Sequence, residues 1–207
     1  TAWLETHDDY VGAYPADVVR FEQKSGRRKR VEHDLDPGKV RAGMRFAHYL
    51  SISPIHCGVF FALYRREALK GSGLHGAFLG SDRVFIGEML LRGRIAQVKG
   101  PQILFREHAE QFSRREVQEE SLAIAWMDPS KRGARTMARN RLILEYLRAV
   151  WRSAPSLRDQ LAGTRAVVGI AWSQRANLSK ELLLPLYRNG RPTVVGQSLL
   201  KLFRSGR

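Results

Sequence analysis

The first half of the chain alternates short apolar runs with turn residues, whereas the second half repeats apolar residues at helical spacing. Apolar runs of about four to eight residues are typical of strands, and recurrence every three or four residues is typical of helices. The pattern predicts strands at 10–21, 57–63, 95–98 and 103–105 and helices at 40–50 and 82–92. Beyond residue 113 it predicts only helices, at 116–127, 135–151, 157–174, 180–184 and 194–203.

Segment 57–63 gives the strongest strand signal, because it is apolar throughout apart from Gly58. Such a run fits a strand buried on both faces at the centre of an α/β sheet. In the helix that follows, Ser81 is the predicted N-cap, Asp82 suits the positive end of the helix dipole, and Gly93 is the predicted end.

Two features of the C-terminal helices stand out in the pattern. Ser156 and Asp159 predict a capping box at the start of the helix 157–174. Within that helix an apolar stripe recurs at helical spacing, so we expect it to pack against a core or an interface; its residues are Leu157, Leu161, Val168 and Trp172.

Composition narrows the class of protein. A chain of 207 residues with 43% hydrophobic residues can build a core, and no run of about 18 apolar residues predicts a transmembrane helix. The single Cys57 excludes an internal disulfide framework and favours a reducing, cytoplasmic compartment. The net charge is +15, and residues 114–207 hold 18 Lys and Arg against 7 Asp and Glu. Such a surface favours polyanions, which include nucleic acid, anionic lipid headgroups and phosphorylated substrates.

Several motifs follow one another between residues 58 and 108. The apolar run ends in Arg65-Arg66, Gly80-Ser81-Asp82-Arg83 opens a helix, Gly93-Arg94 closes it, and two short strands lead to Arg106-Glu107-His108. In this order the motifs resemble the acceptor-side half of a family 2 glycosyltransferase, over about residues 10–115. The resemblance implies an α/β fold for residues 1–115, as the C-terminal part of a GT-A-like mixed sheet with flanking helices. Residues 116–207 then form a basic helical C-terminal extension.

The resemblance also implies an activity. Members of this family transfer a sugar with inversion from a nucleotide-sugar donor to a hydroxyl group, here of a saccharide or lipid-linked acceptor. The donor-binding strands and an Asp-x-Asp motif for a divalent metal, Mg²⁺ or Mn²⁺, precede the matched region in that family. We therefore expect the missing half to precede Thr1, and this chain to supply the acceptor side and to be inactive alone.

Asp82 is the candidate catalytic base, because the family places its base in the acidic position at the start of this helix. A carboxylate there could take the proton from an acceptor hydroxyl. The alternative is that Asp82 only complements the helix dipole, and Ser81 stands where many members have Glu.

His108 is the candidate metal ligand, since the family often supplies a C-terminal His near the donor diphosphate. Arg106 could bind phosphate oxygens through a bidentate fork, and Gln111 could donate a hydrogen bond at the edge of the pocket. Arg65 and Arg66 could bind acceptor or phosphate at the end of the central strand, or equally could cap the sheet and pair with Glu67 or Asp82.

A second class of function stays open at this stage. The basic helices could form a binding module, without catalysis, for nucleic acid or for an anionic membrane surface. Nucleic acid is disfavoured, because no helix-turn-helix, zinc-ligand spacing or aromatic RNA-binding motif occurs. A peripheral membrane association is compatible with a cytoplasmic transferase.

Overall fold

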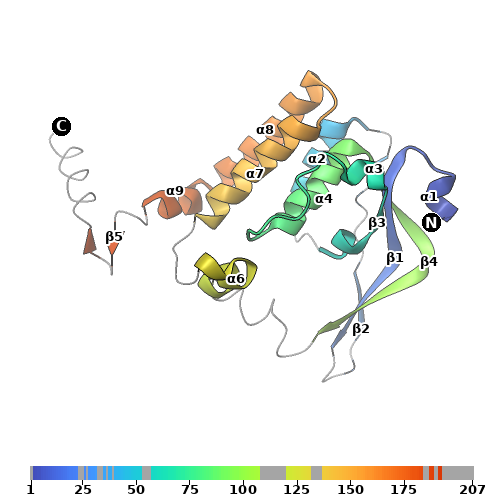
Figure 1. The fold of residues 1–207 in the computed structure, drawn as a ribbon, viewed down its shortest axis with the longest axis horizontal. Helices are drawn as coiled ribbons and strands as arrows, with labels where there is room; N and C mark the ends of the chain where they lie inside the picture. The colour runs from blue at the N-terminus through green and yellow to red at the C-terminus, as the bar shows by residue number, and fades with distance from the viewer. Residues whose placement is uncertain are drawn as a thin grey trace.

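One long strand organises the sheet. β1 (Tyr10–Glu22) pairs along its length with the parallel strand β4 (Arg94–Glu107). On its other edge it pairs with two antiparallel strands, first β3 (Leu63–Tyr64) and then β2 (Arg28–Val31). The fold is therefore mixed α/β, with a small open four-stranded sheet and helices beside it (Figure 1). The computed structural model describes residues 2–22, 26, 28–31, 35, 37–38, 40–52, 57–107, 120–131, 137–183, 187–188 and 191–192.

β4 corrects the prediction of two short strands at 95–98 and 103–105. It is one continuous strand, and the pairing resumes after Lys99-Gly100-Pro101 with Asp17 opposite Gln102. The ladder shifts by a bulge between Pro15 and Asp17 on the partner strand, and Gly100 takes a φ of 112° that favours glycine. Lys99-Gly100-Pro101, which predicted a break between two strands, therefore lie within one strand.

Segment 57–63 is also different from the prediction. Its first part is a 3₁₀ helix, η1 (Cys57–Phe61), and β3 contains only two residues. Val59 is buried in the core, whereas Phe61 and Leu63 are 66% and 48% exposed, so the segment buries one face and not two. An apolar run of this length does not distinguish a buried strand from a short helical turn, because both bury most of their side chains.

Helix α4 (Ser81–Arg92) is the centre of the molecule, with nine of its twelve residues buried. One side of α4 packs on the sheet and on α2 (Ala42–Ser51) through Phe85, Ile86, Met89 and Leu90, together with Tyr14, Tyr49, Val59 and Ile95. A helix that is covered all round belongs to the core, which explains why its apolar residues do not form a single stripe.

The opposite side of α4 is covered by the C-terminal helices. Helices α7 (Ala138–Ser153) and α8 (Leu157–Ser173) share a second core cluster with α2 and α4, and its members are Phe46, Val84, Leu91, Tyr146, Ala149, Val150, Ala154 and Val167. Figure 1 shows three layers: the sheet, then α2 with α4, then α7 with α8. The division at residue 115 stays a prediction, but this cluster joins residues from both segments.

The remaining elements are short. They are α1 (Ala2–Glu5), α3 (Arg66–Leu69), α6 (Glu120–Met127), η2 (Pro129–Lys131), α9 (Arg175–Leu183), and the pair β5 (Tyr187–Arg188) with β6 (Arg191–Pro192). No helix among the described residues is long and apolar enough to cross a membrane. The predicted helix 194–203 lies outside the described residues.

The helix ends confirm one prediction and correct another. Ser156 is the N-cap of α8, because its hydroxyl accepts a hydrogen bond from the Asp159 N–H at 3.2 Å, which confirms that half of the predicted capping box. The Asp159 carboxylate accepts a hydrogen bond from the same hydroxyl. At α4 the N-cap is Gly80 and not Ser81. Gly80 has a φ of 84°, and an added Cβ would lie 3.1 Å from Leu142 Cδ1, so both conformation and space select glycine.

Candidate active site at the start of helix α4

Asp82 lies half-buried in the first turn of α4. Its Oδ1 accepts a hydrogen bond from the Arg83 N–H at 2.9 Å. Among the described residues no cationic side chain pairs with this carboxylate. One carboxylate oxygen is therefore open to an acceptor hydroxyl, as a general base requires.

The strand directions place Asp82 at the end of α4 that points toward the carboxyl ends of the parallel pair, beside the middle of the two strands. α4 returns the chain from the β1 side to the start of β4, so its N-terminus lies toward the ends of β1 and β4 and its C-terminus at their beginnings (Figure 1). In open α/β sheets, ligands bind outside this edge. Asp82 lies on the helix end that faces this edge but short of the strand ends, so the rule gives only the direction in which a site would lie.

Arg106 lies farther along β4 than the start of α4. A helix of twelve residues covers about 18 Å, which corresponds to about five or six strand residues and reaches only the level of Lys99. Arg106 then lies roughly 20 Å farther along the strand, exposed, opposite Phe21 near the end of β1. The structure does not bring Arg106 next to Asp82. His108 and Gln111 lie outside the described residues.

Arg65 is engaged at the other end of the sheet. Because β3 runs antiparallel to β1, the end of β3 lies at the beginning of β1. The Arg65 guanidinium donates to the carbonyl oxygens of Tyr10 (2.7 Å), His7 (3.1 Å) and Leu4, and it lies 3.5 Å from Asp8. This pattern favours the capping alternative for Arg65, but the carboxylate partner is Asp8 and not Glu67 or Asp82. Arg66 is exposed at the first position of α3.

His75 is a polar neighbour of the site that the sequence pattern does not indicate. Its Nε2 lies 2.8 Å from the Oγ of Ser81, which is fully buried. The His75 ring also lies 5.1 Å from the ring of Phe60. The contact holds the loop before α4 against the helix, so it positions the turn that presents Asp82. A single His in a glycine-rich loop gives no periodic signal by which this role could be predicted.

A pocket of about 300 Å³ opens beside the same loop, between residues 77–79, α6 and the start of α7. Its wall is mostly apolar and includes Phe78, Leu79, Ile124, Met127, Met137 and Leu144. Asn140 and Arg141 are its polar residues, and the Arg141 guanidinium lies 4.9 Å from the centre of the Phe78 ring. Asp82 follows this wall by three residues and is not itself a lining residue.

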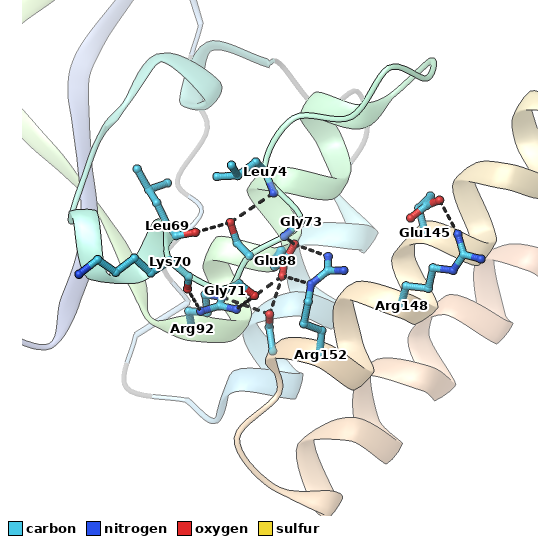
Figure 2. Close-up of polar contacts among 12 residues, drawn as sticks. Leu69, Lys70, Gly71, Gly73, Leu74, Glu88, Arg92, Glu145, Arg148 and Arg152 are labelled. Atoms are coloured by element: carbon cyan, nitrogen blue, oxygen red, sulfur yellow. Dashed lines mark hydrogen bonds and ion pairs between the residues drawn. The ribbon is translucent and has the colours of Figure 1, made fainter.

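A buried carboxylate fixes α4 from behind the site. Glu88 is fully buried, and Figure 2 shows its side chain facing Arg152 of α7 and the loop at Gly73. Arg152 donates to both carboxylate oxygens at 2.8 Å, the Ser153 hydroxyl donates at 2.6 Å, and the Gly73 N–H donates at 3.0 Å. Burial alone would raise the pKa of Glu88, but these hydrogen bonds outweigh it and hold the pKa below its usual value.

Arg92 extends the same network to the loop after α3. It donates to the carbonyl oxygens of Lys70 (3.0 Å) and Gly71 (2.7 Å) and to the Ser153 hydroxyl at 3.1 Å (Figure 2). Its Nη2 also lies 3.7 Å from Glu88. Because each of these groups has a defined partner inside the protein, the network is structural and leaves Asp82 as the candidate for chemistry.

The comparisons with known proteins give no family. No family model, curated protein or solved structure matches the chain. Within the described part of the chain, no three His, Cys, Asp or Glu side chains lie close enough together to hold a metal ion. The proposed ligand His108 lies outside that part, so we derive no step through a metal ion.

Proposed function

We propose that this chain is the acceptor-side portion of an inverting, nucleotide-sugar-dependent glycosyltransferase with a GT-A-like fold, and that Asp82 is its base. The proposal rests on the order of motifs from Gly58 to His108. The structural observation that supports it is the position of Asp82, which lies half-buried in the first turn of the central helix, at the helix end that points toward the carboxyl ends of a parallel strand pair.

In this proposal Asp82 takes the proton from an acceptor hydroxyl as its oxygen attacks the anomeric carbon of the donor sugar. The bond between that carbon and the donor phosphate oxygen breaks, and the nucleoside diphosphate leaves with the bonding electrons. A positioned base of this kind contributes about 10²–10⁴ to the rate. His75 and Gly80 are positioning residues, because they fix the loop and the turn from which Asp82 projects.

The apolar pocket supports an acceptor site on this side of the molecule. Its wall at residues 77–79 is continuous with Gly80-Ser81-Asp82, so a molecule bound there lies next to the segment that carries the base. Pockets of this size that are mostly apolar with a few polar groups are typical of small-molecule sites. The pocket suits an apolar part of an acceptor.

The coding region upstream of Thr1 tests the proposal. We expect a strand-rich segment of about 100 residues, within the ordinary range of domain sizes, that ends in Asp-x-Asp. With that segment the protein should bind a nucleoside diphosphate and a divalent metal. A stop codon or an unrelated domain at that place would remove the proposed donor half and with it the transferase function.

A further inference from the structure

The outward face of α8 is apolar and uncovered. Leu157, Leu161, Val168 and Trp172 are 63%, 57%, 57% and 69% exposed. At about 100° per residue these four positions fall within an arc of about 60° on one side of the helix. The side of α8 that faces the protein is different, with Asp159, Gly163 and Val167 buried. Of the two expected alternatives, packing against the core of the described residues is therefore wrong, and packing at an interface stays a prediction.

The charges beside this stripe are all positive. Arg158 and Arg165 on α8 are exposed and have no carboxylate partner among the described residues. Arg175, at the start of α9, lies with its guanidinium 5.0 Å from the centre of the Trp172 ring.

The acidic residues of α7, α8 and α9 are either buried or paired with a cation. Asp159 and Glu181 are buried, and Glu145 forms an ion pair with Arg148 at 2.8 Å. These three are the only acids in residues 138–183. The outward surface of α8 is therefore apolar and cationic together.

We propose that this face of α8, defined by Leu157, Leu161, Arg165, Val168 and Trp172, binds the surface of an anionic lipid membrane. A helix that lies in the membrane interface buries an apolar strip at the headgroup level and places Arg or Lys against anionic lipids. Trp is favoured at that depth because its ring is amphipathic. The 17-residue helix would lie flat over about 25 Å, and the proposal does not depend on the transferase function.

The charge pattern favours a membrane over the other occupants of such a face. A second copy packed antiparallel along α8 would bring Arg165, at the middle of the helix, against its own counterpart, and like charges across an interface disfavour association. Nucleic acid would match the arginines but leaves four large apolar side chains without a partner. An anionic bilayer matches both the apolar strip and the cations.

Vesicle flotation of the 207-residue chain tests this proposal. Two vesicle types are needed, one of phosphatidylcholine alone and one with about one part phosphatidylserine in four. We expect the chain to float with the anionic vesicles and not with the neutral ones. Binding should weaken as salt rises, because the attraction to anionic lipids is screened.

Surface variants locate the binding face without disturbing the core. Leu161→Ser combined with Trp172→Ser should lower the partition coefficient at least about tenfold, and Arg165→Glu at least about fivefold. Leu104→Ser and Arg83→Glu are the matched controls, since both side chains are exposed on other elements and their replacement should leave binding unchanged. Each variant should keep the wild-type circular dichroism spectrum.

Three outcomes would overturn the proposal. The first is no flotation of the wild-type chain with either vesicle type. The second is flotation that persists in the Leu161→Ser/Trp172→Ser variant, because another surface would then bind the lipid. The third is a concentration-dependent dimer that this double variant abolishes, because the face would then belong to a second copy.

Discussion

Glu88 shows how a charged residue can lie in the middle of a core helix. Its carboxylate is fully buried, yet both oxygens accept hydrogen bonds from Arg152, and Ser153 and Gly73 supply two more. A buried charge with all its partners is tolerated, whereas removal of one partner leaves the other uncompensated. The same hydrogen bonds join α4, α7 and the loop at Gly73, so the residue determines how three segments meet.

Replacement of this charge should therefore cost stability. We expect Glu88→Gln to lower the free energy of unfolding by about 2–3 kcal/mol, less than for a fully buried pair because Arg152 keeps 36% of its side chain exposed. Urea denaturation followed by circular dichroism measures the change. Glu145→Gln is the control: it removes an ion pair with the largely exposed Arg148 and should cost less than about 1 kcal/mol. Equal losses in the two variants would contradict the role given to Glu88.

Three buried acids make the fold sensitive to low pH. Burial opposes ionisation of each, but hydrogen bonds outweigh it and lower the pKa values of Glu88, Asp159 and Glu181 in the folded protein. A lowered folded pKa contributes stability that is complete above the unfolded pKa of about 4 and is lost as the pH falls through the folded value.

We therefore expect the free energy of unfolding to be nearly constant from about pH 7 to pH 5 and to fall steeply below about pH 4. Urea midpoints at a series of pH values measure the profile. The Glu88→Gln variant should show a shallower fall than the wild type, since one of the three groups no longer titrates. A variant profile parallel to that of the wild type would show that Glu88 does not contribute to the acid transition.

Among the elements, α2 and α8 meet through small residues. A Cβ on Gly43 would lie 2.6 Å from the Asp159 carbonyl oxygen and 2.9 Å from the Ala162 Cβ. The Asp159 side chain also accepts a hydrogen bond from the Gly43 N–H at 3.1 Å, so α8 caps the start of α2. The close approach and the cap depend on the absence of a side chain at Gly43.

Gly43→Ala should separate the two helices. We expect a loss of about 1–3 kcal/mol in unfolding free energy, because the nearest atom is backbone and cannot rotate away. Gly169→Ala is the matched variant in α8, where nothing lies within 4 Å, and there alanine should raise stability by about 0.5–1 kcal/mol through helix propensity. Thermal melting of both variants measures these changes in stability. A Gly43→Ala variant as stable as the wild type would contradict the close packing of α2 against α8.

The elements that sequence reasoning predicted correctly have local signals. The N-cap of α8 depends on Ser156 and Asp159, which are three residues apart, and the end of α4 at Gly93 depends on one residue. The 3₁₀ turn at Cys57–Phe61 and the continuity of β4 across Gly100 depend on pairing with distant segments. No short-range pattern contains that information.

In the candidate site, too, some features follow from a local sequence motif and others do not. Asp82 follows from a local motif, and its place in the first turn of a helix was predictable. The hydrogen bonds of Arg65 to three carbonyl oxygens and the pocket beside α7 arise from segments far apart in the chain. The contact of His75 with Ser81 spans only six residues, but it depends on the conformation of the loop between them. They could be found only once the fold was known.

At the scale of the whole molecule, α4 connects the sheet to the C-terminal helices. The second core cluster contains residues from before and after position 115. Those before it are Phe46, Val84 and Leu91, and those after it include Tyr146, Val150 and Val167. Residues in both segments thus contribute to one core cluster, and neither segment buries this cluster alone.

A chain that ends after residue 115 should therefore lack a stable fold. Without α7 and α8 it would expose the apolar residues of the second core cluster and leave Glu88 without Arg152. We expect the truncated chain to lose cooperative urea unfolding and to bind a hydrophobic dye, whereas residues 1–183 should retain the transition. A cooperative transition in the 1–115 chain would mean that the sheet and α4 are stable without the helices.

The central claim, that Asp82 is the base of a sugar transfer, is tested most directly by Asp82→Asn in the protein encoded by the complete reading frame. The account predicts that transfer falls by about 10²–10⁴ while the affinity for the nucleotide-sugar is unchanged. The control Asp8→Asn, at a carboxylate whose side chain is 96% exposed, should transfer normally. Turnover by the Asp82→Asn variant close to that of the wild type would contradict the assignment.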